Sequence, residues 1–299
     1  MEGLPQGIPQ QELLDAGVHF GHLRKKWNPK MLPYIFMERK GIHIIDLAKT
    51  NEGLVRAAAA LKQLARSGRR IMFVATKKQA KDIIAEAATR INMPFVTDRW
   101  LGGMLTNFST IRKSIKKMNT IDKALAEGAV GLVKKERLML EREREKLSKV
   151  LGGIANLNRT PSALFVVDIS HEHLALAEAH KLNLTTVGIV DTNADPTLVD
   201  YAIPANDDAS KSISIITNYI IAAIEEGLKE REQDQIDNPN NEEVEAEFSD
   251  ERFSERGKDD EKDDRRRGGN RRRSGGDNNN SNDRQGGGNR GGGKRPPRG

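Results

Sequence analysis

The chain has 299 residues and no cysteine, which excludes disulfide frameworks, thiolate metal sites and cysteine nucleophiles. The N-terminus lacks the basic and apolar regions of a signal peptide, and the longest apolar stretch, residues 213–224, is too short to cross a bilayer. The formal net charge of +6 combines +7 in residues 1–233, −10 in residues 234–264 and +9 in residues 265–299. We therefore expect a cytoplasmic protein, not a membrane protein, with a mildly basic body and an oppositely charged pair of C-terminal blocks.

The segment 16–50 combines basic side chains with large aromatic ones and with Gly and Pro. Only residues 41–47 have the apolar pattern of a buried strand. Basic side chains that neutralise phosphates, next to flat rings that stack on nucleobases, are typical of an RNA-binding surface, and a merely solvated surface is the alternative. From this segment we assign to RNA binding Arg24, Lys25, Lys26, Trp27, Lys30, Arg39 and Lys40.

Short apolar runs alternate with stretches of helical spacing from residue 41 to about residue 226. This alternation is typical of a parallel sheet that is covered by helices on both faces. We predict an α/β fold with a doubly wound, mostly parallel sheet of the flavodoxin or Rossmann kind. The predicted strands are 71–75, 95–97, 162–168, 186–190 and 201–203, and the predicted helices are 52–67, 77–91, 171–182 and 207–226.

One segment interrupts this alternation with two apolar series separated by a turn at residues 127–129. Charged residues fill the remaining positions of the second series, so the pair predicts an antiparallel helical hairpin inserted into the body at residues 105–151. Two sheet-covering helices are the alternative. The apolar residues are Ile111, Ile115, Met118, Ile121 and Leu125, followed by Leu132, Met139, Leu140, Leu147 and Leu151.

The C-terminal region, residues 233–299, contains very few large apolar residues. Such a chain cannot bury enough surface to offset the entropy lost on ordering, so we expect a disordered tail, first acidic and then rich in Arg and Gly. Arg–Gly tracts contact phosphates and bases without fixed geometry, and a solubilising linker is the alternative. The predicted domains are a body of residues 1–104 and 152–232, the hairpin of residues 105–151 and this tail.

The carboxyl ends of the strands are where a doubly wound sheet would bind a nucleotide. The sequence there has neither the Gly-rich dinucleotide fingerprint nor a P-loop, and the turn after residues 71–75 contains no glycine. We therefore expect no enzymatic activity and no cofactor; a nucleotide-binding flavodoxin-like enzyme is the alternative. Lys77 and Lys78, which open a predicted helix, are instead assigned to phosphate binding.

Two histidine pairs and a set of aspartates could ligate metal. His19 with His22, or His171 with His173, could bind zinc, while the turns around Asp191 and Asp207 could attract Mg²⁺. Loop hydrogen bonds, turns and helix caps are the more frequent use of such residues. We therefore assign no metal ligand.

A second informative segment, DRWLGGMLTNFSTI at residues 98–111, places Arg99 beside Trp100. We add Arg99 to the RNA-binding residues, whereas Trp100 is equally suited to the core. This segment and residues 16–50 closely resemble the bacterial family of the second small-subunit ribosomal protein. The resemblance covers about residues 10–227 and includes FVATKKQA (73–80), LEREREKLSKVLGGI (140–154), ALFVVDISHE (163–172) and VGIVDTNADPTLVDYAIPANDDASKSI (187–213).

The resemblance implies a ribosome-associated structural component of the small subunit rather than an enzyme. It implies small-subunit rRNA and neighbouring small-subunit proteins as partners, among them the large OB-repeat mRNA-binding protein that this family helps to anchor. It also implies that the inserted hairpin is a coiled-coil protrusion. An extra-ribosomal RNA-binding chaperone that acts through the Arg/Gly tail is the alternative function.

Overall fold

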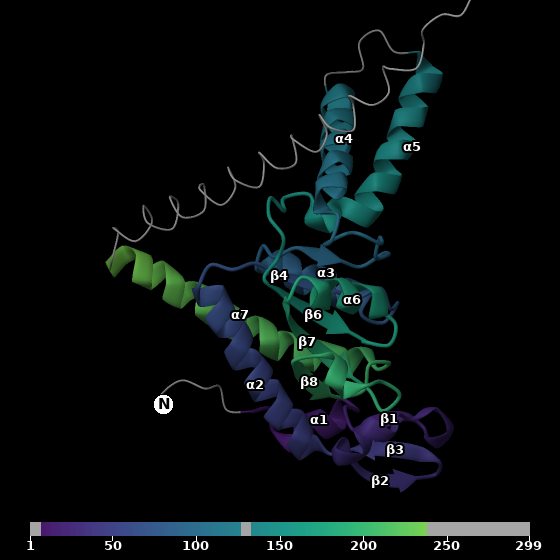
Figure 1. The fold of residues 1–299 in the computed structure, drawn as a ribbon, viewed down its shortest axis with the longest axis vertical. Coiled ribbons are helices and arrows are strands. Elements are labelled where there is room, and N and C mark those ends of the chain that lie inside the picture. The colour runs from purple at the N-terminus through teal and green to yellow at the C-terminus, as the bar shows by residue number, and fades with distance from the viewer. Residues whose placement is uncertain (1–6, 127–132, 238–299) are drawn as a thin grey trace, which may run out of the picture. The chain divides into compact units, whose positions relative to one another are not determined.

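A five-stranded parallel sheet forms the centre of the fold in the computed structural model, which describes residues 7–126 and 133–237 (Figure 1). The strand order β5-β4-β6-β7-β8 is that of a flavodoxin-like sheet, so the predicted doubly wound α/β class is confirmed. The strands are β4 (Ile71–Val74), β5 (Phe95–Val96), β6 (Ala163–Val167), β7 (Thr185–Val190) and β8 (Tyr201–Pro204).

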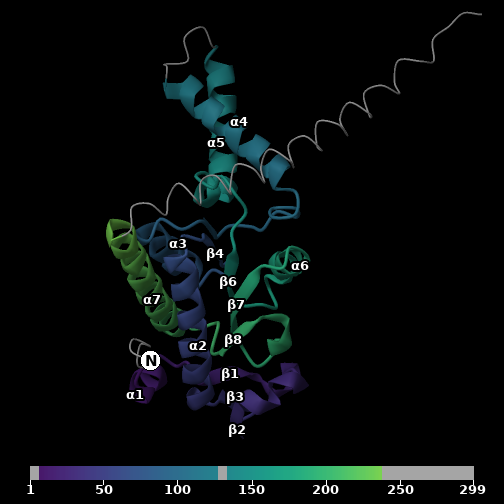
Figure 2. The ribbon, with the colours of Figure 1, turned by 60° about the vertical axis from the view of Figure 1, so that its left-hand side comes forward.

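Helices cover both faces of this sheet because the central strands are apolar on both sides. Phe73 and Phe165 lie on one face, with ring centroids 5.4 Å apart, and belong to the core under α2, α3 and α7. Met72 and Val166 belong to the core of the other face, under α6 (Figure 2). The helices are α2 (Leu47–Arg66), α3 (Lys81–Arg90), α6 (His173–Lys181) and α7 (Ser210–Asp237), and a short α1 (Gln10–Asp15) precedes them.

Several helix ends differ from the prediction for identifiable reasons. Helix α2 begins earlier, at Leu47, because the side chain of Asp46 accepts a hydrogen bond from the backbone of Ala48. Helix α3 begins later, at Lys81, because residues 77–80 form a turn and Thr76 does not act as its cap. Helix α7 continues through residues 233–237, which we expected to be disordered, and Arg66 of α2 pairs with Asp234 there at 2.9 Å. The rest of the predicted tail lies outside the described residues.

A second, antiparallel sheet of order β1-β3-β2 was not predicted. Residues 41–47 were expected to form a buried strand, but β3 (Ile42–Ile45) is only half-buried and pairs with β1 (Phe20–Leu23) and β2 (Ile35–Arg39). Both residues of the β2–β3 turn, Lys40 and Gly41, have positive φ, which is the requirement of a tight hairpin turn. Register shifts in both pairings break the alternation of apolar and polar residues that would have indicated the sheet.

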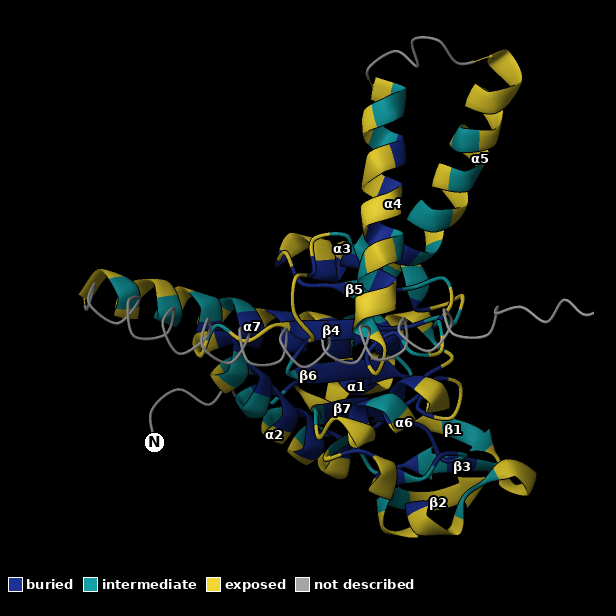
Figure 3. Cartoon of the chain, turned by 45° about the horizontal axis from the view of Figure 1, so that its top comes forward, coloured by how far each residue is buried: buried dark blue, intermediate teal, exposed yellow. Residues whose placement is uncertain are grey.

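The inserted segment forms two packed helices, α4 (Phe108–Ala126) and α5 (Lys134–Leu151), which extend beyond the β5 edge of the sheet (Figure 3). On α4, the predicted apolar residues Ile111, Ile115, Met118 and Ile121 are buried. The prediction is wrong for Met139 of α5, which is 61% exposed, because the first part of this helix, residues 134–139, is exposed at every position. Leu132 lies outside the described residues.

Four 3₁₀ turns complete the described part of the chain: η1 (Arg24–Lys26), η2 (Pro29–Tyr34), η3 (Gly152–Ile154) and η4 (Pro196–Leu198). Turn η3 lies close against β5, since a Cβ on Gly153 would come within 2.2 Å of the carbonyl oxygen of Phe95. No helix within residues 7–126 and 133–237 is long and apolar enough to cross a membrane.

Candidate nucleic-acid interface

The small sheet gathers five of the predicted RNA-binding side chains in one place. The backbone N–H of Arg24, at the start of η1, donates a 3.0 Å hydrogen bond to the carbonyl of Gly41 in the β2–β3 turn. Two segments that are separate in sequence therefore present their basic side chains side by side, and all of them are exposed: Arg24, Lys25, Lys26, Arg39 and Lys40. We call these five residues the basic surface. Only Arg24 among them has an ion pair within the described residues, with Glu38 at 3.3 Å.

Trp27 and Lys30 are also near this surface but have partners within the protein. The Trp27 ring is half-buried and packs at a tilt on His43, with ring centroids 5.2 Å apart. The ammonium of Lys30 lies 2.6 Å from Asp195 and 3.2 Å from the hydroxyl of Thr197. Trp27 thus packs against the small sheet through His43, and the side chain of Lys30 links η2 to η4.

Hydrogen bonds fix the small sheet to the loop after β7. The backbone N–H of Asn28 donates to the carbonyl of Thr192 at 2.8 Å, and the backbone N–H of His22 donates to the Thr192 hydroxyl, also at 2.8 Å. A Cβ on Gly21 would come within 2.6 Å of the Thr192 side chain, so only glycine allows this approach. The basic surface is therefore held on a sheet with a defined position on the body.

Lys77 has a different environment from the other predicted RNA-binding residues. Its ammonium lies 3.2 Å from Asp168, 2.7 Å from Asp207 and 2.6 Å from Asp208. Burial lowers the pKa of Lys77, but the hydrogen bonds to Asp207 and Asp208 outweigh burial and leave its pKa raised. Lys77 is thus a charged group that these carboxylates already neutralise, whereas the adjacent Lys78 is exposed.

Arg99 lies in a loop that is organised by a single carboxylate. Glu178 of α6 accepts hydrogen bonds from the indole of Trp100 at 3.0 Å and from the backbone N–H of Gly103 at 2.7 Å. It also accepts from the backbone of Leu105 and Thr106, both at 3.0 Å. Trp100 is buried in the core, while Arg99 is exposed, so the loop presents Arg99 outward.

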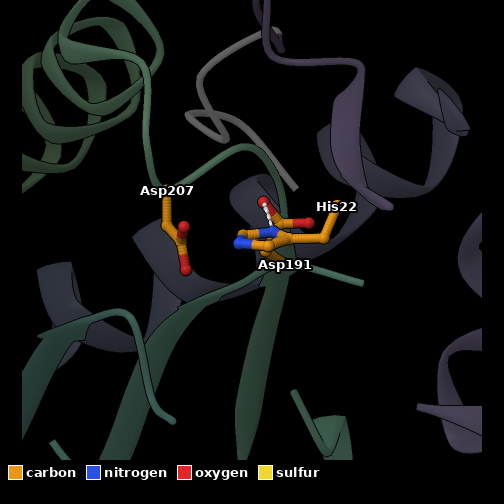
Figure 4. A group of neighbouring side chains, drawn as sticks. All are labelled: His22, Asp191 and Asp207. Carbon is orange, nitrogen blue, oxygen red and sulfur yellow. Dashed lines mark ion pairs between the residues drawn. The ribbon is translucent and has the colours of Figure 1, made fainter. Parts of the chain in front are cut away.

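His22, Asp191 and Asp207 come together although they lie far apart in sequence (Figure 4). His22 Nδ1 is 3.0 Å from Asp191, and one atom from each of the three side chains lies within 4.8 Å of the others. The Oδ2 atom of buried Asp207 has no hydrogen-bond partner. One nitrogen and two carboxylate oxygens form a donor set that Zn²⁺ accepts, so these three residues could hold a metal ion. The histidine pairs considered from sequence are not brought together in this way.

Electrostatics within this cluster favour an additional cation. Burial raises the pKa of Asp207 to about 7, and repulsion by Asp168 and Asp191 contributes. The hydrogen bond with Asp191 raises the pKa of His22 above its ordinary value. Burial is the largest cause of the shift at Asp207, and the carboxylate of Asp191 contributes to both shifts. The cluster therefore carries repulsion between neighbouring carboxylates. A bound proton or metal ion would relieve it.

The position at which a flavodoxin-like sheet binds its ligand, between the carboxyl ends of β4 and β6, is filled by side chains of this protein. The hydroxyl of Thr76 donates to buried Glu172 at 2.5 Å and lies 2.9 Å from His171 Nδ1. Lys77 and Asp168 close the same end of the two strands. Carboxylates in this position repel the phosphates that a nucleotide would bring.

Comparison with known proteins identifies the family. The model of the family described as ribosomal protein S2 matches residues 13–227. The chain belongs to the ribosomal protein S2 family. It is 60% identical over 231 residues to the small ribosomal subunit protein uS2 of Cytophaga hutchinsonii, which covers 77% of this chain and 91% of that protein. It is 59% identical over 226 residues to the protein of the same name from Bacteroides fragilis, which covers 75% of this chain and 81% of that protein. It is 55% identical over 251 residues to the one from Flavobacterium psychrophilum, which covers 83% of this chain and 94% of that protein.

As a member of the S2 family, the chain is a structural ribosomal protein of the small subunit and not an enzyme. This agrees with the absence of a phosphate-binding loop from the sequence and with the side chains that fill the ligand position of the sheet. The expected resemblance is thereby confirmed.

Sequence reasoning missed two features of this S2-family protein. The first is the role of Glu178, which no short motif indicates because its partners lie far earlier in the chain. The second is a group of exposed apolar side chains on the small sheet, where Phe20 is 48% and Phe36 is 69% exposed. Phe20 and Phe36 line the same hollow of the small sheet, and this grouping depends on the unpredicted pairing of the strands.

Proposed function

We propose that this protein binds small-subunit rRNA through its basic surface, with Lys78 and Arg99 as further phosphate contacts. The observation that carries the proposal is the grouping of Lys25, Lys26, Arg39 and Lys40, which are exposed and have no ion pair within the described residues. Such side chains gain free energy by releasing counterions from phosphates. Trp27 and Lys30 act by holding the basic surface in place, whereas Lys77 is held by carboxylates at the strand ends of the parallel sheet.

The second part of the proposal is that the protein, in the cytoplasm and on the ribosome, helps to anchor the large OB-repeat mRNA-binding protein of the small subunit. The sequence resemblance supports this part. A protein fixed on rRNA by one surface leaves its other surfaces available for a neighbouring protein. The function is therefore that of a scaffold that supports mRNA capture and translation.

Sucrose-gradient sedimentation of the tagged protein tests the ribosomal role. We expect stoichiometric co-migration with small subunits, and we expect subunits depleted of the protein to lose the OB-repeat protein as well. Migration with free RNA near the top of the gradient would instead favour the extra-ribosomal chaperone.

A salt series tests the basic surface directly. In the variant K25Q/K26Q/K40Q, the log–log slope of rRNA-fragment affinity against salt concentration should become shallower by roughly 0.7–0.9 for each lost phosphate contact. The matched control K181Q/K211Q/K229Q removes three exposed lysines elsewhere and should keep the original slope. Equal slopes for both variants would contradict the proposal.

A further inference from the structure

A cavity of about 310 Å³ lies at the amino ends of β4 and β5, at the foot of the hairpin where α5 is followed by η3. It is at the opposite end of the parallel strands from the cluster of Lys77 and Asp207. Its volume is at the lower limit for small-ligand pockets, which span about 300–1,000 Å³, so it would admit one small organic group. None of the residues that line it carries a carboxylate.

The two charged residues of this cavity are arginines, Arg70 and Arg159. Neither has an ion pair within the part of the chain that the structure describes. Arg70 is held in place, because its guanidinium donates a 2.5 Å hydrogen bond to the carbonyl of Asn92, a residue with a φ of 50°. Two guanidinium groups that lack a counterion, one of them fixed, form a site that is ready for a phosphate.

The rest of the lining combines an apolar wall with amide groups. Phe95 and Leu157 contribute apolar surface, and Asn156 and Asn158 add side-chain amides to the lining. An amide donates and accepts hydrogen bonds at once, as do the edges of nucleobases, while an apolar wall packs against the flat face of a base. The cavity thus offers separate partners for a phosphate and for a base.

We propose that this cavity binds one unpaired nucleotide of RNA, with its phosphate on Arg70 and Arg159 and its base between the apolar wall and the amides. The proposal rests on the proposed rRNA-binding function and adds a second contact to it, apart from the basic surface. A site of this size takes a single nucleotide, so it recognises RNA where the strand is unstacked.

Photo-crosslinking of the full-length protein to a 4-thiouridine-containing RNA tetranucleotide, followed by peptide mapping, tests the site. We expect cross-links in the peptides that contain Phe95 or Asn156. Crosslinking there should fall about 10-fold in R70Q/R159Q, and the control K211Q/K229Q should match the unaltered protein. Equal yields from R70Q/R159Q and the unaltered protein would overturn the proposal.

A steric variant keeps both arginines. Gly152 lines the cavity and has helical dihedral angles of −56° and −44°, and a Cβ there would meet only the hydroxyl of Ser148, at an ordinary contact distance of 3.6 Å. The backbone therefore accepts G152L, which should lower the same cross-links by a similar factor without lowering the melting temperature. An unchanged yield in G152L would overturn the assignment of the base to this cavity.

Competition distinguishes the source of the phosphate. Excess adenosine monophosphate should compete more weakly than an unlabelled tetranucleotide, and inorganic phosphate should compete least. If phosphate competes as well as the tetranucleotide does, the cavity is a simple anion site and the proposal is wrong. If adenosine monophosphate equals the tetranucleotide, the ligand is a free nucleotide and the RNA assignment is wrong.

The two proposals can fail separately. Cosedimentation of R70Q/R159Q with small subunits, together with unchanged cross-links, would overturn the cavity proposal and leave the ribosomal function intact. If the unaltered protein does not bind small subunits or rRNA fragments at all, the proposed function itself is wrong. Cross-links from the cavity peptides to 4-thiouridine-labelled rRNA in assembled subunits would support both.

Discussion

The indole nitrogen of Trp100 donates a 3.0 Å hydrogen bond to the carboxylate of Glu178. The same carboxylate accepts backbone hydrogen bonds from Gly103, Leu105 and Thr106, so one side chain of α6 closes the loop that leads into α4. Gly103 has a φ of 86°, which lets the backbone turn so that these N–H groups converge. The position of Arg99 at the start of this loop therefore depends on a residue in another helix.

Replacing Glu178 by Gln should destabilise this loop. The amide of Gln directs two donor hydrogens at groups that are themselves donors, so at least one buried N–H loses its partner. A loss of about 1–3 kcal/mol in the free energy of unfolding is expected, measured by chemical denaturation with Trp fluorescence. The control Glu86→Gln changes an exposed residue of α3 and should stay within about 0.5 kcal/mol.

The stabilisation by Glu178 should also depend on pH. Burial alone would raise its pKa, but the hydrogen bonds from Thr106, Trp100, Gly103 and Leu105 outweigh burial and lower the pKa below the ordinary 4.5. A depressed pKa means that the stabilisation is fully present above pH 4.5 and is lost as pH falls through the folded-state value. The difference between wild type and E178Q should shrink below pH 4.5, and a constant difference would argue against this account.

Lys30 and Lys26 should respond differently to the same substitution. Lys26 is exposed and has no ion pair within the described residues, whereas Lys30 is held by Asp195, and this hydrogen bond is the main cause of the lowered pKa of Asp195. K26Q should reduce the salt slope of rRNA binding by roughly 0.7–0.9. K30Q should leave the slope unchanged, as measured by fluorescence anisotropy, and a reduced slope in K30Q would show that Lys30 leaves Asp195 to contact RNA.

The strands of the parallel sheet were predictable because each is a short, continuous apolar run with a clear end. Ile71–Val74 is buried at every position, so no knowledge of its neighbours was needed. The small sheet was not predictable in the same way. In β2, Phe36 and Met37 are both exposed, and a register shift lies between Ile35 and Met37, so the period of two is lost.

The residues of the candidate site differ in the same way, since some can be recognised from local sequence and others cannot. Exposed basic residues such as Lys25 and Lys40 could be recognised from local sequence, because exposure requires no partner. Lys77 has the same local sequence character, but its partners come from the loops after β6 and β8. Only the three-dimensional arrangement of the strand ends determines that its charge is neutralised within the protein.

The cluster of His22, Asp191 and Asp207 should bind Zn²⁺. Zinc added to chelator-treated protein is expected to raise the melting temperature and to saturate at one equivalent, because it binds the folded state only. Asp207→Asn should abolish the shift, and the control Asp82→Asn on α3 should retain it. Mg²⁺ should have little effect on the melting temperature, since a histidine ligand favours zinc.

Because Asp207 has a pKa of about 7, its proton competes with the metal, and the apparent affinity for zinc should fall below pH 7. An equal shift in D207N would exclude this site.

The hairpin should be removable in its outer part but not at its base. Ile111, Ile115 and Leu151 belong to the core that includes Trp100 and Met104, whereas Met118 and Ile121 are buried outside that core. Lys117 and Glu143 form an ion pair across the two helices, so a short Gly linker between them can replace residues 118–142. This truncation should leave unfolding cooperative and change the free energy of unfolding by less than about 1 kcal/mol, whereas Ile115→Ala should lower it by about 2–5 kcal/mol because it opens a cavity in the core.

Deleting residues 106–151 should abolish cooperative unfolding, as measured by circular dichroism during urea denaturation. A cooperative transition in that longer deletion would show that the body needs nothing from the hairpin.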